Sequence, residues 1–291
     1  MGLVFGALFE KSHVYEPMAI RGQFNFEKWI MMKMFMGAVA GSCGSFAILS
    51  AAAPAKFAAV RAGFHPVQRG IVTGGVCGGG LLGAGMAIAG ACPGMVLPQV
   101  GTGLDNSLVT TAGGLCGALA FGLLEPTIRP LLAKGAQCTG DADDYIDVKL
   151  DKPFALLCVP LGVACGGLAL LLEILVPFQG ELQGSGTDPG DSSLLGLSAK
   201  CWPPALCGLL LGMLQLPAAL GLADSLGSSA SYQCVSSQWL HLAPSKTRKT
   251  FAYAEGFRTG VFPWWQVCLA AQSFKCTHIV TDVTDKRLCL R

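Results

Sequence analysis

Cys92 is the residue of this chain whose surroundings best suit chemistry at a restricted site. It stands between Gly90 and Gly94 and is followed directly by Pro93, within an uncharged segment of 35 residues, 70–104. About 20 apolar residues suffice to cross a bilayer. Glycine and proline at that depth favour a helix that breaks where backbone and side chains face a pathway. The pattern therefore predicts a break near residues 91–98 that presents the Cys92 thiol to a transport path.

A buried packing thiol is the alternative interpretation of Cys92, because free cysteine often behaves as a small hydrophobe. Among the 13 cysteines, several lie inside apolar stretches and are expected to pack in this way: Cys43, Cys77, Cys116, Cys158, Cys165 and Cys207. The sequence has no C-x-x-C pair and no Cys/His cluster with the spacing of a zinc site. We therefore expect no metal and no other cofactor.

The elements that would position Cys92 are membrane helices. Hydrophobic residues make up 52% of the 291 positions and charged residues only 13%, too few to coat the outer helices of a soluble α/β protein. Uncharged stretches long enough to span a bilayer cover residues 34–55, 106–124, 153–172 and 201–223. The formal net charge of +2 and the lack of a basic stripe argue against a nucleic-acid partner. We expect an all-α polytopic protein whose partner is the lipid bilayer, with the plasma membrane favoured.

The chain is expected to contain two related transmembrane halves. Residues 1–130 form the first repeat, 131–152 a solvated acidic connector, 153–272 a second, incomplete repeat, and 273–291 a polar tail that is loosely ordered outside the bilayer. Residues 179–193 are rich in glycine, serine and aspartate, which predicts a flexible loop. A weak internal repeat supports the division, because GLVFGALF at residues 2–9 matches GLLLGMLQ at residues 208–215 in four of eight positions. Two-repeat transporters, often inverted, show such symmetry.

Close helix packing is predicted by pairs of small residues four positions apart, which let helices approach closely in lipid. These pairs are Gly37/Gly41, Gly79/Gly83, Gly113/Gly117, Gly162/Gly166 and Gly208/Gly212. Two glutamines within or beside apolar stretches, Gln99 and Gln215, either line the path or form hydrogen bonds between helices.

The segment GAGMAIAGACPGMVLPQVGTG, residues 83–103, resembles the first-repeat signature of the sulfur-transport (YeeE/YedE-like, thiosulfate transporter) family. Residues 5–42 and 210–232 resemble the eukaryotic branch of that family, and the resemblance extends over roughly residues 3–266. It implies an inverted-repeat helical fold whose broken helices converge on a narrow midpoint, where thiols pass a small sulfur-containing anion. Cys92 would be such a thiol, with Gly90, Pro93, Gly94 and Gln99 beside it on the path and Gln215 as a further path residue.

The resemblance implies transport of a thiosulfate-like anion, whose terminal sulfur can accept the weak S–H donor of a protonated thiol. Backbone N–H groups at helix ends would meet its oxygens. The family's second-repeat block, of G-G-C-T-S-G-H type, has no counterpart after Gln266, so the chain resembles a shortened member and is expected to transport poorly alone. The alternatives are a non-transporting or regulatory membrane protein and a membrane sulfurtransferase. The sulfurtransferase would need a group that promotes a Cys92 thiolate.

Overall fold

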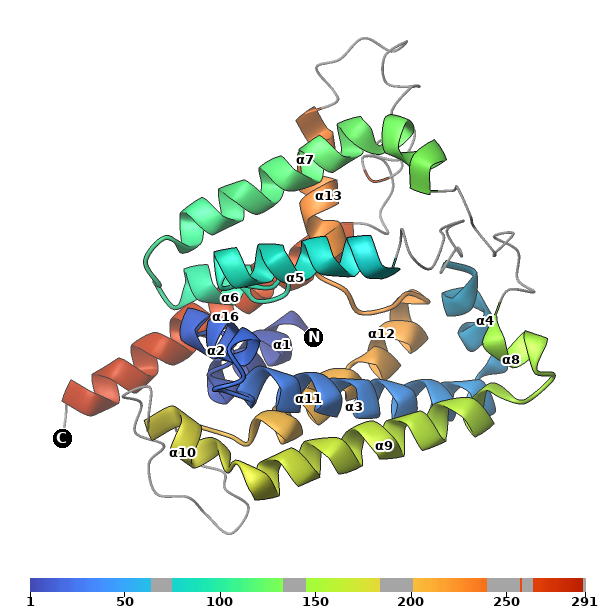
Figure 1. Ribbon diagram of the computed structural model, residues 1–291, viewed down its shortest axis with the longest axis horizontal. Helices are drawn as coiled ribbons and strands as arrows, with labels where there is room; N and C mark the ends of the chain where they lie inside the picture. Colours follow the sequence, from blue (N-terminus) through green and yellow to red (C-terminus); the bar gives the residue numbers. More distant parts are fainter. Residues whose placement is uncertain (64–74, 133–144, 184–200, 240–256, 258–263, 290–291) are drawn as a thin grey trace.

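The computed structural model describes residues 1–63, 75–132, 145–183, 201–239, 257 and 264–289, and every regular element in these ranges is a helix. Figure 1 shows their arrangement, with α3 and α9 side by side along the lower edge of the view and α7 across the top. The helices are α1 (Gly2–Ser12), α2 (Pro17–Phe24), α3 (Ile30–Ala52), α4 (Pro54–Gly63), α5 (Gly78–Ala89), α6 (Val96–Gly101), α7 (Ser107–Leu132), α8 (Ile146–Lys149), α9 (Phe154–Leu175), α10 (Phe178–Gln183), α11 (Pro204–Met213), α12 (Gln215–Leu222), α13 (Ser229–Ser237) and α16 (Trp264–Cys289).

Four stretches of the described chain are long and apolar enough to cross a membrane: Ile30–Ala52, Ser107–Ile128, Phe154–Leu175 and Pro204–Leu222. They coincide with the four spans expected from the sequence, and the last consists of α11 and α12 joined at Leu214. Many of their large apolar side chains are exposed, such as Ile174 of α9, which is 77% exposed. Such faces suit lipid rather than water. The expected all-α polytopic architecture is confirmed, whereas the inverted relation of the two halves stays a prediction.

Helices α3 and α11 cross at the glycines of two predicted small-residue pairs. A Cβ atom added at Gly208 would lie 2.0 Å from the carbonyl oxygen of Met34, and one at Gly37 would lie 2.3 Å from that of Ala205. Gly41 and Gly212 meet the opposite backbone in the same way. These glycines therefore let the two backbones touch, as small residues do in membrane helix pairs.

The other small-residue pairs differ from one another. A Cβ atom at Gly162 of α9 would lie 2.9 Å from the Cβ of Cys43, so α9 also packs closely on α3. By contrast, a Cβ atom at Gly79, Gly113 or Gly117 would meet nothing within 4 Å among the described residues. Among the described residues, the expectation of close packing is therefore wrong for the pairs on α5 and α7.

The acidic connector is partly structured. Asp147 of α8 binds the guanidinium of Arg61 on α4 through two hydrogen bonds, of 2.5 and 2.6 Å, and the Tyr145 hydroxyl donates to the Arg61 carbonyl oxygen over 3.0 Å. These bonds from Arg61 hold the pKa of the Asp147 carboxyl below its usual range. Within the expected acidic connector, residues 146–149 thus form a short helix bound to α4. Residues 133–144 lie outside the described chain, and the connector as a whole stays a prediction.

Candidate functional site: the break between α5 and α6

The uncharged segment around Cys92 breaks as predicted. Helix α5 ends at Ala89, Gly90 adopts a left-handed conformation with φ of 63°, and α6 begins only at Val96. The Gly90 N–H still donates to the Met86 carbonyl oxygen, over 2.8 Å, so the break begins with an ordinary glycine cap. A continuous lipid-facing helix through Cys92 is therefore excluded, and residues 90–95 form turns and irregular backbone between the two helices.

Replacing Gly90 with alanine is expected to destabilise this break. A left-handed backbone costs a non-glycine residue about 1–2 kcal/mol, and the new Cβ would lie 2.9 Å from the Cβ of Pro17 on α2. Thermal unfolding of the purified protein in detergent measures the loss. Gly80→Ala is the matched control, because that glycine is on α5 with open space around it, and alanine there should be neutral or slightly stabilising. Equal stability of the two variants would contradict the assigned role of Gly90.

Gln99 stabilises the break by satisfying backbone carbonyl groups. Its side chain is buried, 3% exposed, and its amide nitrogen donates to the carbonyl oxygens of Gly90, over 3.1 Å, and Tyr15, over 2.7 Å. On the other side, the guanidinium of Arg21 donates to the Ile88 carbonyl oxygen over 3.0 Å. Of the two interpretations of Gln99, hydrogen bonding between segments is observed. Buried carbonyl groups at a helix break need such donors, because they have no partner within the helix.

The Cys92 thiol lies on the inner side of the break and is partly buried. It packs against the central cluster of buried side chains, which includes Phe9 of α1 and Met95 at the start of α6. A Cβ atom at Gly94 would lie 3.8 Å from the Cys92 Sγ and 3.3 Å from the Ser228 Oγ. The thiol and the start of α13 therefore border the same space beside Gly94, while Pro93 is exposed.

An open cavity of about 760 Å³ lies between α5, α7 and α13 and reaches the break. Ala91 and Pro93 line it at the break, and Ser229 and Tyr232 line it from α13. Most other lining residues are glycines or aliphatic residues of α5 and α7, so the cavity is largely apolar. Both glycines of the pair on α7 are among these lining residues, so that pair faces the cavity and has no close helix partner there.

Helix α16 is part of the framework around the break, so the expectation of a loosely ordered tail over residues 273–291 is wrong for residues 273–279. Ser273 and Thr277 are 1% and 0% exposed, and Cβ atoms at Gly6 of α1 and Gly101 of α6 would collide with them. Their hydroxyl groups donate to carbonyl oxygens of α16 itself. Small hydroxyl residues can thus be buried against glycine without losing hydrogen bonds, and the helix continues to Cys289.

Gln215 connects α12 to the segment that precedes α13. Its Oε1 accepts from the Leu226 N–H over 2.7 Å, and its Nε2 donates to the Leu226 carbonyl oxygen over 3.3 Å. For Gln215 too, the interpretation as a hydrogen-bonding residue agrees with the observed contacts. Gln215 therefore positions the approach to α13 and Ser228, and a direct role on the path stays a prediction.

The cysteines expected to pack in the core do so only in part. Cys43, Cys158 and Cys207 are buried, and the Cys158 thiol donates to the Cys43 carbonyl oxygen over 3.6 Å. Cys77 and Cys116 are instead exposed, because their helices are not covered at those positions by other described residues. The described residues hold no group of three or more His, Cys, Asp or Glu side chains suited to a metal ion.

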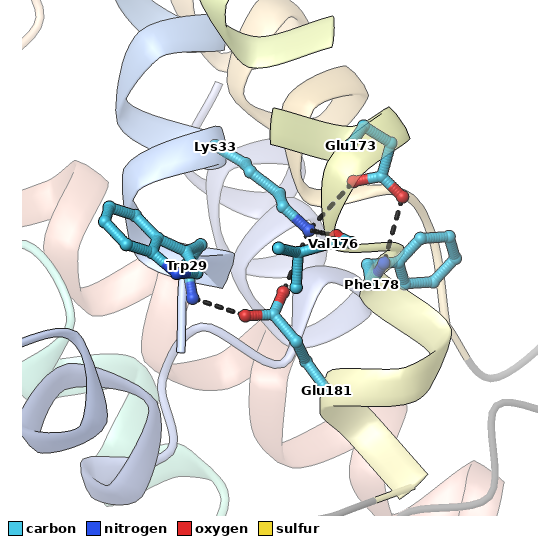
Figure 2. Close-up of polar contacts among 6 residues, drawn as sticks. All are labelled: Trp29, Lys33, Glu173, Val176, Phe178 and Glu181. Carbon is cyan, nitrogen blue, oxygen red and sulfur yellow. Dashed lines mark hydrogen bonds and ion pairs between the residues drawn. The ribbon is translucent and has the colours of Figure 1, made fainter. Parts of the chain in front are cut away.

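A buried charge cluster around Lys33 was missed in the sequence. Lys33 is 0% exposed, and its ammonium lies 2.9 Å from Glu181 Oε2 and 3.2 Å from Glu173 Oε2 (Figure 2). It also donates to the carbonyl oxygen of Val176, which follows the last residue of α9. The expectation of a flexible loop over residues 179–193 is therefore wrong at α10, which carries the buried Glu181.

The two carboxylates of this cluster also hold helix ends. Glu181 accepts from the N–H of Trp29, at the start of α3, and Glu173 accepts from the Phe178 N–H over 3.0 Å (Figure 2). A carboxylate at a helix start and an ammonium at a helix end both complement the helix dipole. The cluster thus fixes α3, α9 and α10 relative to one another.

The family model for sulphur transport matches residues 11–270, which is most of the chain. The match includes the break between α5 and α6, the Lys33 cluster and all four candidate spans. No curated protein and no solved structure matches the chain. The chain belongs to the sulphur transport family and, with its four apolar helices, is an integral membrane protein.

Proposed function

We propose that this chain moves a small sulfur-containing anion of the thiosulfate type across a membrane and that the Cys92 thiol contacts the anion on its way. The proposal is supported above all by the break between α5 and α6, where Cys92 lies between two helix ends and its neighbours Ala91 and Pro93 line an open cavity. A regulatory membrane protein would not require this combination. The expectation that this transport is poor depended on the missing second-repeat block after Gln266, and it stays a prediction.

The chemistry of the break suits passage rather than tight binding. A protonated thiol is a weak donor that can contact a soft, negatively charged sulfur without adding a repelling negative charge of its own. Weak contacts in series let an anion enter and leave, whereas a single tight site would hold it. The apolar walls of the cavity add no competing charge.

Replacing Cys92 with alanine is expected to abolish thiosulfate uptake in a sulfur-starved host that depends on this protein, while expression and thermal stability stay near the wild type. The reason is that alanine keeps the backbone of the break but removes the S–H donor. Uptake of labelled thiosulfate is the measurement. Cys116→Ala and Cys165→Ala are matched controls, because both thiols lie on spanning helices away from the break. Equal losses in all three variants would indicate general destabilisation and contradict a special role of Cys92.

A further inference from the structure

Tyr232 carries a buried hydroxyl group that is unsatisfied in the described part of the structure. The residue lies on α13, is 8% exposed, and its hydroxyl oxygen has no hydrogen-bond partner among the described residues. Leaving a buried polar group unpaired destabilises a protein, because the group loses its bonds to water and gains none. Such a group is therefore expected to gain a partner in another state of the protein.

The position of Tyr232 relates it directly to the break. Its side chain packs against Ala91 and Val96, which flank the Cys92 loop, and it lines the same cavity as Pro93. Its ring also lies against Gly114 of α7, where an added Cβ would be 3.0 Å from the ring. The Tyr232 ring is thus packed between α7 and the residues that flank the break.

The start of α13 adds further donors on the same side. Ser228 precedes the helix, but its hydroxyl forms no capping bond to it. Instead, that hydroxyl borders the space beside Gly94 that the Cys92 thiol also borders. The first N–H groups of a helix lack partners within the helix and favour negative charge. The Ser228 hydroxyl therefore lies near Cys92, while Ser229 and Tyr232 of the same helix line the cavity beside the break.

We propose that Tyr232 and Ser228, with the start of α13, form a subsite for the oxygen atoms of a tetrahedral sulfur oxyanion. This inference rests on the proposed function: the hydroxyl groups bind the oxygens while the Cys92 thiol faces the terminal sulfur. No covalent step is involved, since every contact is a hydrogen bond. The subsite makes Tyr232 a specificity-determining residue, which distinguishes oxyanions from anions that lack oxygen.

Binding measurements on purified, detergent-solubilised protein test the subsite with two probes, thiosulfate and sulfate. Sulfate has the oxygens of thiosulfate but no terminal sulfur. Tyr232→Phe removes only the hydroxyl and is expected to weaken binding of both anions about tenfold to hundredfold, as for a lost hydrogen bond to a charged group. Cys92→Ala is expected to weaken binding of thiosulfate while leaving that of sulfate near the wild type.

Tyr145→Phe is the matched control, because it removes a phenolic hydroxyl that bonds to α4 rather than facing the cavity. It should leave both affinities unchanged. If Tyr232→Phe does not fold, Ser228→Ala is used in its place, and it should lower the affinity for both anions. A folded Tyr232→Phe variant with wild-type affinities would overturn the subsite but leave the proposed function standing. Wild-type affinities in Ser228→Ala would have the same meaning if Tyr232→Phe does not fold. Failure of the wild-type protein to bind thiosulfate would instead overturn the proposed function.

Discussion

Replacing Lys33 with methionine is expected to lower the free energy of unfolding by about 3–5 kcal/mol, the usual cost of removing one partner from a buried ion pair. The ammonium is fully buried, forms ion pairs with Glu173 and Glu181, and donates a hydrogen bond to the carbonyl oxygen that follows α9. Methionine fills a similar volume but leaves the carboxylates without a cation and the carbonyl without a donor. Equilibrium unfolding in detergent micelles measures the loss.

Two comparisons separate this effect from a loss of packing. Lys56→Met, at an exposed position of α4, should change stability by no more than about 0.5 kcal/mol. The triple variant Lys33→Met/Glu173→Leu/Glu181→Leu should regain part of the loss, because replacing a whole buried ion cluster by apolar residues is often nearly neutral. A Lys33→Met protein as stable as the wild type would show that the cluster does not hold α3, α9 and α10 together.

Replacing Gly208 with valine is expected to cost about 3 kcal/mol, the upper part of the usual range for overpacking. The first added carbon would lie 2.0 Å from the Met34 carbonyl oxygen and 2.9 Å from the Ala38 nitrogen. Backbone on the facing helix cannot rotate away as a side chain would, so α3 and α11 must separate. Thermal unfolding in detergent and the yield of folded protein both report this separation.

Gly113→Val on α7 is the matched control for Gly208→Val. Gly113 belongs to a pair with the same spacing, but a Cβ there meets nothing within 4 Å. Its effect on stability should stay within about 1 kcal/mol, the cost of valine's lower helix propensity and of changed lipid contacts. Equally large losses in both variants would show that α7 packs against a partner as closely as α11 packs against α3.

The membrane class and the break could be predicted because both depend on local composition. Uncharged stretches gave the four spans, and glycine and proline around Cys92 predicted the end of α5 near Gly90. The partners of Gln99 could not be predicted, since Tyr15 lies 84 residues away. Local chemistry therefore predicts where a helix stops, whereas the groups that stabilise the stop come from distant segments.

Lys33 and α16 show why charge alone misled the prediction. Lys33 was placed outside the span that begins at residue 34, yet α3 begins at Ile30 and buries it. Its carboxylate partners are 140 and 148 residues away in the chain, so the residues near Lys33 do not predict that its charge is paired. In α16, Lys275 is exposed while Ser273 and Thr277 are buried. A helix can bury one face and expose its charges on another, which composition over residues 273–291 cannot show.

The small-residue pairs also show that a local pattern does not identify its packing partner. Gly37/Gly41 and Gly113/Gly117 have the same spacing, yet only the first pair meets another backbone. Spacing states which helix face can approach closely, but the partner is decided by the order of the whole bundle. The pair on α7 instead borders the cavity that reaches the break at Ala91 and Pro93.

Transport through the break is tested most directly by the flux of labelled thiosulfate into liposomes that contain the purified chain, compared with the Cys92→Ala variant and with empty liposomes. We expect uptake above that of empty liposomes for the wild type and a loss of this uptake in Cys92→Ala protein that is equally folded and equally reconstituted. Flux no greater than that of empty liposomes from folded wild-type protein, or undiminished flux in the Cys92→Ala variant, would contradict it.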